Sequence, residues 1–175
     1  ARVELPGYAE LDELFMRADN RAEAPLIVIL DGITDPHNLG AILRTADAAG
    51  VHGVIIPKDK AAGLTPSAVK ASAGAAAYCP VVQVTNIVRT IKELKQRRLW
   101  ITGLDQEGEQ TFEHIDWCGP SALVMGSEGR GTRRLVRDSC DFFASIPMHG
   151  HINSLNVSVA AALCMFEARR QRIRL

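Results

Sequence analysis

The sequence predicts an α/β fold in which a mostly parallel sheet is covered by helices on both faces. Short apolar runs with the length of buried strands alternate with segments of helical periodicity, an order typical of βαβ units. The first run, Leu26 to Leu30, is continuously apolar, as expected of a strand that is buried on both faces. The chain has 175 residues, 47% of them hydrophobic, which is enough for one well-packed domain.

The elements are expected in a regular order along the chain. Strands are predicted at residues 26–30, 53–57, 81–84, 99–104, 122–125 and 143–146. Helices are predicted at residues 36–49, 66–73, 86–97, 132–139 and from residue 155 onward. Asp35 and Pro36 have the residue types of an N-cap and a first helical position. In the last helix, the face expected to pack on the core combines residues at helical spacing: Leu155, Val159, Ala162, Leu163 and Phe166.

Residues 1–24 are expected to be a linker before the main domain. A strand end is expected at Ala1 to Leu5, a short helix at Leu11 to Arg17 and a polar stretch at Ala18 to Ala24. Because a protein rarely begins within a strand, we expect these residues to be the tail of a preceding domain in the natural protein. Residues 25–175 are expected to form the domain that carries the function.

Composition excludes several classes of function. Twenty basic and twenty acidic side chains give a formal net charge of zero, so any RNA or DNA surface must be a local patch. The four cysteines lie far apart in the sequence, which argues against a zinc site. Neither a signal peptide nor a membrane-spanning apolar run is recognised, and we therefore expect the protein in the reducing cytoplasm.

Polar residues gather in loops that are expected at the carboxyl ends of strands, where parallel sheets bind ligands. The first loop, Asp31 to Gly40, places Asn38 in the first turn of a helix that also carries Arg44. The alternative for Arg44 is a solvated pair with Asp47 at spacing i, i+3.

The second loop, Leu123 to Gly131, runs from a buried strand into a glycine-rich turn. Such a turn favours close approach of the backbone to a ligand. The glycine spacing fits neither the dinucleotide fingerprint nor the phosphate-binding P-loop, which argues against a nicotinamide-dependent oxidoreductase. The alternative for Glu128 is that it complements a helix dipole.

The third loop opens the last helix with His151, Asn153, Ser154 and Asn156. Ser and Asn at such a position cap a helix, which is the simplest interpretation. Capping needs only one such side chain, however, and a helix N-terminus with free N–H groups also suits a polar ligand.

Three stretches of the sequence resemble the consecutive motifs of a known enzyme family. They are DGITDPHNLGAILRTADAAGV, LVMGSEGRGTRRL and SIPMHGHINSLNVSVAAALCMFEARRQ. From about Pro25 to Arg172 the chain resembles the SpoU (TrmH-like) methyltransferases of the SPOUT superfamily, and most of all the RlmB-type members. The resemblance implies a C-terminal trefoil knot, S-adenosylmethionine as methyl donor and a homodimer. It also implies methylation of a guanosine ribose 2′-hydroxyl in 23S ribosomal RNA.

The resemblance also assigns roles to individual residues. Matched to the motifs, the catalytic side chains would be Asn38, Arg44, Glu128, Ser154 and Asn156. Backbone contacts to the cofactor would come from Gly103, Gly126, Ile146, Met148 and Leu155. A cluster close to the second motif is expected to bind RNA phosphates: Arg130, Arg133, Arg134 and Arg137. The arginines that end the chain are expected to form a solvated face: Arg169, Arg170, Arg172 and Arg174.

The expected reaction is attack of the ribose hydroxyl on the methyl group, so orientation and removal of one proton are the tasks of the protein. Neutralising a guanidine, whose ordinary pKa lies near 13, costs roughly 8 kcal/mol at neutral pH. Arg44 is therefore expected to clamp a phosphate at least as readily as to act as a base. A transfer-RNA ribose methyltransferase and a non-catalytic RNA-binding or assembly factor are the alternatives.

Two further expectations concern assembly and RNA binding. The homodimer is expected on the last helix and the first-motif helix, with Val157, Ala161 and Met165 as extra apolar surface. RlmB-type relatives usually carry a small RNA-binding domain before the linker. We therefore expect residues 1–175 to bind the methyl donor but to methylate ribosomal RNA poorly without such a domain.

Overall fold

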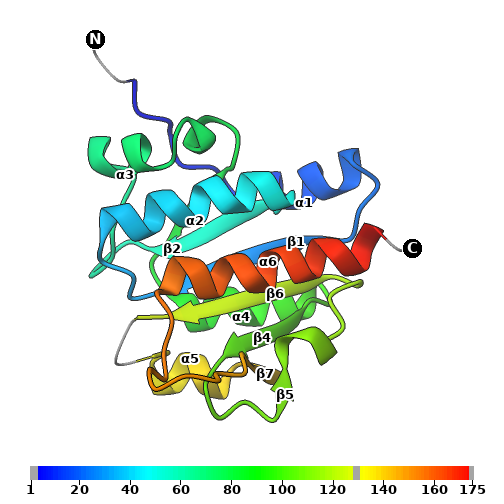
Figure 1. The fold of residues 1–175 in the computed structure, drawn as a ribbon. Helices are drawn as coiled ribbons and strands as arrows, with labels where there is room; N and C mark the ends of the chain where they lie inside the picture. Colours follow the sequence, from blue (N-terminus) through cyan, green and yellow to red (C-terminus); the bar gives the residue numbers. More distant parts are fainter. Residues whose placement is uncertain (1–3, 128–130, 174–175) are drawn as a thin grey trace.

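Seven parallel strands form one sheet in the order β3-β2-β1-β6-β4-β7-β5 (Figure 1). This arrangement comes from a computed structural model that describes residues 4–127 and 131–173. The strands are β1 Leu26–Asp31, β2 Gly53–Pro57, β3 Val81–Val84, β4 Trp100–Leu104, β5 Gln110–Thr111, β6 Ser121–Gly126 and β7 Phe142–Ser145. The predicted α/β class with a parallel sheet is thus confirmed.

Six α-helices and two short 3-10 helices connect the described strands. The helices are α1 Leu11–Asn20, α2 Pro36–Ala49, α3 Pro66–Ala71, η1 Ala75–Ala77, α4 Ile87–Gln96, η2 Phe112–His114, α5 Arg134–Asp138 and α6 Val157–Ile173. The predicted strands and helices from residue 11 onward are all present, with ends that shift by up to three residues. The strand end expected at Ala1 to Leu5 is not formed by Glu4 and Leu5, and residues 1–3 lie outside the described part of the chain. The two-residue strand β5 and the helix η2 lie in the stretch that the sequence left irregular.

Local chemistry explains where the helices begin and end. The Asp35 side chain accepts a hydrogen bond from the backbone N–H of His37 at 2.8 Å, and Pro36 follows as the first residue of α2. Gly50 ends α2 in the left-handed conformation, with φ of 74°. Asn86 caps α4 in the same way as Asp35 caps α2, by accepting from the N–H of Arg89 at 3.0 Å.

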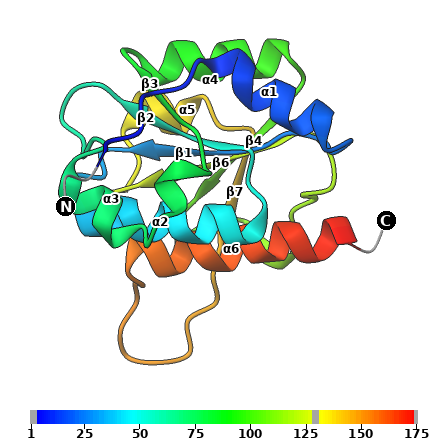
Figure 2. The same ribbon diagram turned by 90° about the horizontal axis from the view of Figure 1, so that it is seen from above.

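Two apolar cores lie on opposite faces of the sheet (Figure 2). Helices α2, α3 and α6 cover one face, and α1, α4 and α5 cover the other. All residues of β1 are buried, as its continuous apolar sequence predicts. Leu14 and Ala18 of α1 are fully buried, and Leu14 belongs to the core beneath the sheet. Helix α1 therefore packs on the sheet although it precedes the first strand.

The predicted buried face of the last helix is wrong for three of its five residues, whereas Leu155, which precedes the helix, packs against the core. Val159, Leu163 and Phe166 are exposed, whereas the residues that face the core are Val157, Ala160, Ala161, Cys164, Met165 and Ala168. Helix α6 is apolar on both sides, and periodicity cannot tell which side meets the sheet. The buried side is rich in small residues, which allow α6 to pack closely beside α2. Val157, Ala161 and Met165, expected to add surface for a dimer, are therefore core residues.

The prediction of a solvated face for the last arginines is wrong for Arg169 and Arg172. Arg169 Nε donates to the carbonyl oxygen of Ala49 at 2.8 Å, and Arg172 Nε donates to that of Trp117 at 2.8 Å. A guanidinium carries five donors, and these two satisfy carbonyl groups where the chain enters and leaves the sheet. Arg174 lies outside the described residues.

Within residues 4–127 and 131–173, no helix is both long and apolar enough to cross a membrane. The trefoil knot that the resemblance implies stays a prediction.

Candidate active site

A cavity of about 540 Å³ lies beyond the carboxyl ends of β4, β6 and β7. These ends are side by side because β4 pairs with both β6 and β7 in parallel register. The lining residues come from four chain segments: Leu104, Asp105, Gln106 and Glu107; Met125, Gly126, Ser127 and Gly131; Ile146 and Met148; Asn153, Ser154, Leu155, Val157 and Ala160. Position and size fit a site for a small organic molecule.

The cavity has an apolar interior and a polar rim. Leu104, Met125 and Ile146 continue the apolar core, which reaches the cavity from the sheet. The rim carries the carboxylates of Asp105 and Glu107. Amide and hydroxyl side chains line the same space: Gln106, Ser127, Asn153 and Ser154. Figure 2 shows that the segment between β7 and α6 extends outward past α6, and its two ends supply part of this lining. The arrangement suits a ligand with a flat apolar part and several hydrogen-bonding groups.

Glycine is required where the chain leaves β6. A Cβ at Gly126 would lie 2.2 Å from the carbonyl carbon of Gly131 and from the nitrogen of Thr132. Gly131 has a φ of 64°, and its N–H donates to the carbonyl oxygen of Ser127 at 2.8 Å. The glycines thus allow two parts of the chain to pack closely at the cavity wall. The same lack of side chains leaves room for a ligand beside the backbone.

Asp31, at the end of β1, is a buried carboxylate that sequence reasoning did not select. Its Oδ2 accepts the backbone N–H of Arg133 at 2.9 Å, and its Oδ1 accepts Nε of the same residue at 2.8 Å. The Asp31 side chain is 1% exposed. The signal in the sequence was a single charge at the end of a continuous apolar strand, which is costly to bury without partners.

Asp105, at the end of β4, has a similar arrangement on the other side of β6. Its Oδ1 accepts the backbone N–H of Glu107 at 2.8 Å, and its Oδ2 accepts a hydrogen bond from Arg137. Burial raises the pKa of Asp105, but these hydrogen bonds and the Arg137 charge outweigh it and hold the pKa below its ordinary value. The Arg137 guanidinium also stacks on the ring of Phe143, 4.5 Å from its centroid.

The N-termini of α2 and α6 meet through two asparagines. Nδ2 of Asn156 donates to Oδ1 of Asn38 at 3.2 Å. Asn156 also caps α6, because its Oδ1 accepts the backbone N–H of Ser158 at 2.8 Å. The capping interpretation of the third loop is therefore correct for Asn156, and the same side chain also contacts the first loop.

The matching family model is that of the SpoU rRNA Methylase family, and it covers residues 25–166. The chain belongs to this family. The 23S rRNA (guanosine-2′-O-)-methyltransferase RlmB of Pseudomonas putida is 54% identical over 166 residues, which are 95% of this chain and 66% of that protein. The chain therefore spans about two thirds of the length of this curated relative.

Solved structures of SpoU enzymes have the same fold. The SpoU methyltransferase AviRb from Streptomyces viridochromogenes, in complex with the cofactor AdoMet, matches with a TM-score of 0.86 and 34% identity. The match covers 97% of this chain and 67% of that one. The A. aeolicus TrmH/SpoU tRNA modifying enzyme matches with a TM-score of 0.78 and 31% identity over 92% of this chain and 85% of that chain.

The SpoU motifs supply the catalytic candidates, and the structure places them in two groups. Ser154 lines the cavity, whereas Asn38 and Asn156 contact each other outside its lining. Arg44 is exposed on α2, and its side chain makes neither an ion pair nor a hydrogen bond with the described residues, so the alternative pair with Asp47 is not formed. Glu128 lies outside the described residues.

Four of the five SpoU cofactor candidates line the cavity: Gly126, Ile146, Met148 and Leu155. Gly103 lies one residue before the lining, and a Cβ there would be 2.9 Å from the Phe143 ring. Sequence reasoning missed several lining residues on the segment after β4 and in the second loop: Asp105, Gln106, Glu107 and Ser127. Asn153, one of the polar residues noted in the third loop, also lines the cavity.

The arginines expected to bind RNA differ in their surroundings. Arg133 and Arg137 are hydrogen-bonded to Asp31 and Asp105, whereas Arg134 is 92% exposed and lies 3.9 Å from Asp138. Arg130 lies outside the described residues.

Proposed function

We propose that this chain is the catalytic part of an S-adenosylmethionine-dependent enzyme that methylates the ribose 2′-hydroxyl of a guanosine in 23S ribosomal RNA. The observation that carries the proposal is the cavity of about 540 Å³ at the carboxyl ends of β4, β6 and β7, lined by residues of the second and third motifs. The names of the RlmB relatives and the cofactor bound to AviRb support the substrate and the methyl donor.

The cavity fits the methyl donor in size and chemistry. Leu104, Met125 and Ile146 offer an apolar surface for an adenine ring, and the backbones of Gly126, Met148 and Leu155 offer hydrogen-bonding groups. Carboxylates of Asp105 and Glu107 on the rim favour a cationic ligand. When bound, S-adenosylmethionine supplies an electrophilic methyl group on a sulfonium.

The residues around the cavity orient the RNA and manage one proton. Asn38 and Asn156 join the N-termini of α2 and α6, and Ser154 brings a hydroxyl to the cavity wall next to this junction. Arg44, exposed on α2, keeps its guanidinium available for bidentate binding of a phosphate of the target nucleotide. Glu128 is proposed to act with them. In this arrangement Arg44 orients the ribose and remains charged throughout. The proton of the 2′-hydroxyl leaves to the clamped phosphate or to solvent as the methyl group is transferred.

RNA is proposed to reach the site across helix α5. Arg134 projects fully into solvent there and is the best-placed described cation for a phosphate. Because the formal net charge of the chain is zero, attraction of RNA depends on such local cations and on Arg44.

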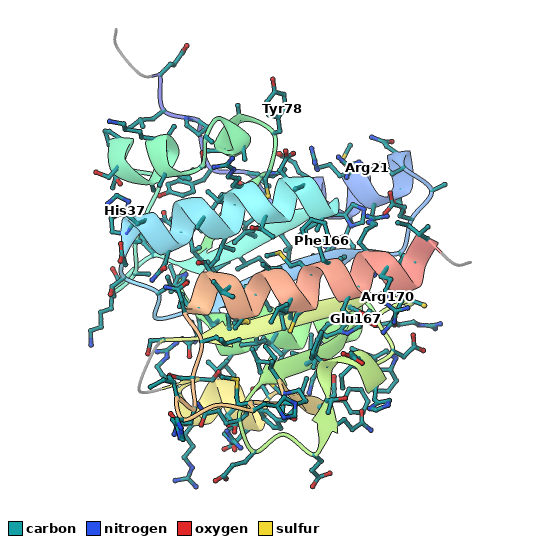
Figure 3. All side chains as sticks on the ribbon, viewed as in Figure 1. Arg21, His37, Tyr78, Phe166, Glu167 and Arg170 are labelled. Carbon is teal, nitrogen blue, oxygen red and sulfur yellow. The ribbon has the colours of Figure 1, made fainter. Side chains whose placement is uncertain are left out.

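We propose a homodimer that uses the exposed face of α6. Val159, Leu163 and Phe166 are 39% to 48% exposed and lie on one face at helical spacing. Phe166 lies in the helix layer of α2 and α6 (Figure 3). Apolar side chains grouped in this way mark a surface for protein association.

The test is binding of S-adenosylmethionine by calorimetry, followed by transfer of a labelled methyl group to a 23S RNA fragment. Digestion and mass mapping then locate the modified ribose. Transfer RNA at the same concentration tests the alternative of a transfer-RNA ribose methyltransferase, which the similarity to the A. aeolicus tRNA modifying enzyme suggests. Absence of cofactor binding at millimolar ligand would overturn the proposal. Because residues 1–175 are expected to methylate RNA poorly by themselves, transfer is also measured with a chain that carries an upstream RNA-binding domain. Cofactor binding without transfer to either RNA by that longer chain would favour a non-catalytic RNA-binding factor.

A further inference from the structure

We infer that the pairs Asp31–Arg133 and Asp105–Arg137 are positioning residues that hold two walls of the cavity in the geometry that binds the methyl donor. Arg133 and Arg137 are then engaged by these aspartates, and the phosphate contacts of α5 fall to Arg134. This inference rests on the proposed function, because it concerns the binding of S-adenosylmethionine in the same cavity.

The first pair joins the end of β1 to the start of α5. Asp31 receives two hydrogen bonds from one residue, at 2.9 Å from the backbone and 2.8 Å from the side chain of Arg133. A carboxylate with 1% exposure is stable only with such charge-assisted donors. Loss of the Arg133 side chain would remove one of the two donors of the buried Asp31 carboxylate, so this contact is costly to break.

This pair also holds the cavity wall next to it. Asp31 lies opposite Gly126 in the register of β1 and β6, and Gly126 lines the cavity together with Ser127 and Gly131. Gly131 is bonded to Ser127 and precedes Arg133 by two residues. The cavity wall that begins at Gly126 in β6 is therefore held at Arg133, two residues after Gly131, by the contact with Asp31.

The second pair fixes another wall. Asp105 lines the cavity after β4, and the hydrogen bond from Arg137 holds its carboxylate against α5. Stacking of Arg137 on Phe143 of β7 limits the rotamers available to the guanidinium. Strand order β1-β6-β4 places the two aspartates on either side of β6, so α5 is tied to the sheet at both of its ends.

The spacing of the arginines explains the division of roles. Arg133 and Arg137 are four residues apart and lie on one side of α5, toward the sheet. Arg134 points away, with 92% of its side chain exposed. The helix and its N-cap residue thus carry two arginines that are paired with aspartates of the sheet and one arginine that is exposed to solvent.

The experiment compares Arg137→Ala with Arg97→Ala, which is a close match. Arg97 also pairs with an aspartate, Asp12, and stacks on a phenylalanine, Phe15, at 4.3 Å, with 41% exposure against 44% for Arg137. Asp12 and Phe15 belong to α1, away from the cavity lining. Calorimetry on the 175-residue protein should give about a tenfold weaker Kd for S-adenosylmethionine in Arg137→Ala and less than about a twofold change in Arg97→Ala.

The same comparison is made for the buried carboxylate. Asp31→Asn should weaken S-adenosylmethionine binding by about tenfold or more, whereas Asp141→Asn, whose carboxylate accepts the N–H of Ile101 at 2.8 Å, should not. Arg133→Ala, on a residue that is largely exposed, keeps the test valid if Asp31→Asn fails to fold. Adding Arg133→Ala to Asp31→Asn should cost little more than Asp31→Asn alone, because both act through one contact.

Two readouts separate positioning from general stability. In steady-state assays, Arg137→Ala should raise KM for S-adenosylmethionine and leave kcat at saturating cofactor within about twofold. Its thermal midpoint should fall no further than that of Arg97→Ala. The salt slope of RNA binding should decrease by about one unit in Arg134→Ala and stay unchanged in Arg137→Ala.

Distinct results identify which idea fails. If the unmodified protein does not bind S-adenosylmethionine, the proposed function is wrong. If it binds, but Arg137→Ala and Arg97→Ala have the same Kd, the positioning role is wrong while the proposed function stands. A lower salt slope for Arg137→Ala would show that this residue binds RNA phosphates and would overturn its assignment to the pair with Asp105.

Discussion

Nδ2 of Asn156 donates a hydrogen bond to Oδ1 of Asn38 at 3.2 Å, across 118 positions of sequence. The other atom of the same amide, Oδ1, accepts the backbone N–H of Ser158 and caps α6. The oxygen of this side chain thus caps the helix, and its nitrogen links the third motif to the first. The two tasks can be separated by substitution, because aspartate retains the acceptor and lacks the donor.

Asn156→Asp should therefore fold normally and lose activity. Its carboxylate still caps α6, whereas Asn38 loses the donor and faces a negative charge. Asn156→Ala should lose both tasks and about 1 kcal/mol of stability from the missing cap. Thermal unfolding and methyl transfer, measured on both variants, test this. Full activity of Asn156→Asp would show that the contact with Asn38 is not needed for the reaction.

Arg44→Ala should lower the rate of methyl transfer by about a hundredfold or more, without weakening S-adenosylmethionine binding. The side chain is exposed and, within the described part of the chain, unpaired, so its removal exposes no buried partner and should leave the thermal midpoint unchanged. Asn38→Ala and Glu128→Ala are also expected to abolish methyl transfer while leaving the fold and most of the S-adenosylmethionine affinity intact.

The control for Arg44→Ala is Arg89→Ala, on an exposed arginine of α4 at the opposite face of the sheet. Single-turnover transfer from saturating cofactor measures the chemical step in both variants. Near-normal turnover of Arg44→Ala in a protein that methylates RNA would exclude Arg44 from the mechanism.

The sequence was sufficient for the order and type of the main elements, because buried strands and capped helices have local signals. Leu26 to Leu30 and the Asp35–Pro36 cap are examples. The motifs located the site, but the contacts that hold it were not predictable. Asp31 meets Arg133 across 102 positions only because β1 and β6 are neighbours in the sheet, and periodicity contains no information on strand order.

The same limit explains the error on α6. Its two apolar faces are equally periodic, and the choice between them depends on the close packing of α2 and α6. Large residues such as Leu163 and Phe166 look like core in the sequence, yet the small residues Ala161 and Ala168 are the ones that fit there.

His52 should make stability fall in mild acid. It is fully buried, its Nδ1 accepts the backbone N–H of Leu26 at 2.9 Å, and burial lowers its pKa from 6.5 to about 4, against the opposing effect of Glu23. Between these values the unfolded chain binds a proton that the folded protein does not. The contribution of neutral His52 is therefore complete above pH 6.5 and is lost as the pH falls toward about 4, by up to about 1.4 kcal/mol per pH unit.

Urea unfolding at several pH values across this window measures the effect. In His52→Asn, the amide oxygen can still accept from Leu26, and no proton is taken up, so the variant should lose less stability than the unmodified protein between neutral and acid pH. Parallel curves for the two proteins would assign the acid sensitivity to other groups.

The exposed face of α6 should determine whether the protein forms a dimer. Val159, Leu163 and Phe166 follow one another at helical spacing, and burying a side chain such as Leu or Phe contributes about 1.5–3 kcal/mol. Leu163→Arg places a charge in the middle of this face and should give a monomer that still binds S-adenosylmethionine. Ile173→Arg, at the end of the same helix and already 72% exposed, should leave the dimer intact. Sedimentation at micromolar concentration with cofactor present decides the matter. If the unmodified protein is a monomer, the proposed dimer is wrong. If Leu163→Arg is still a dimer, the interface lies on another surface.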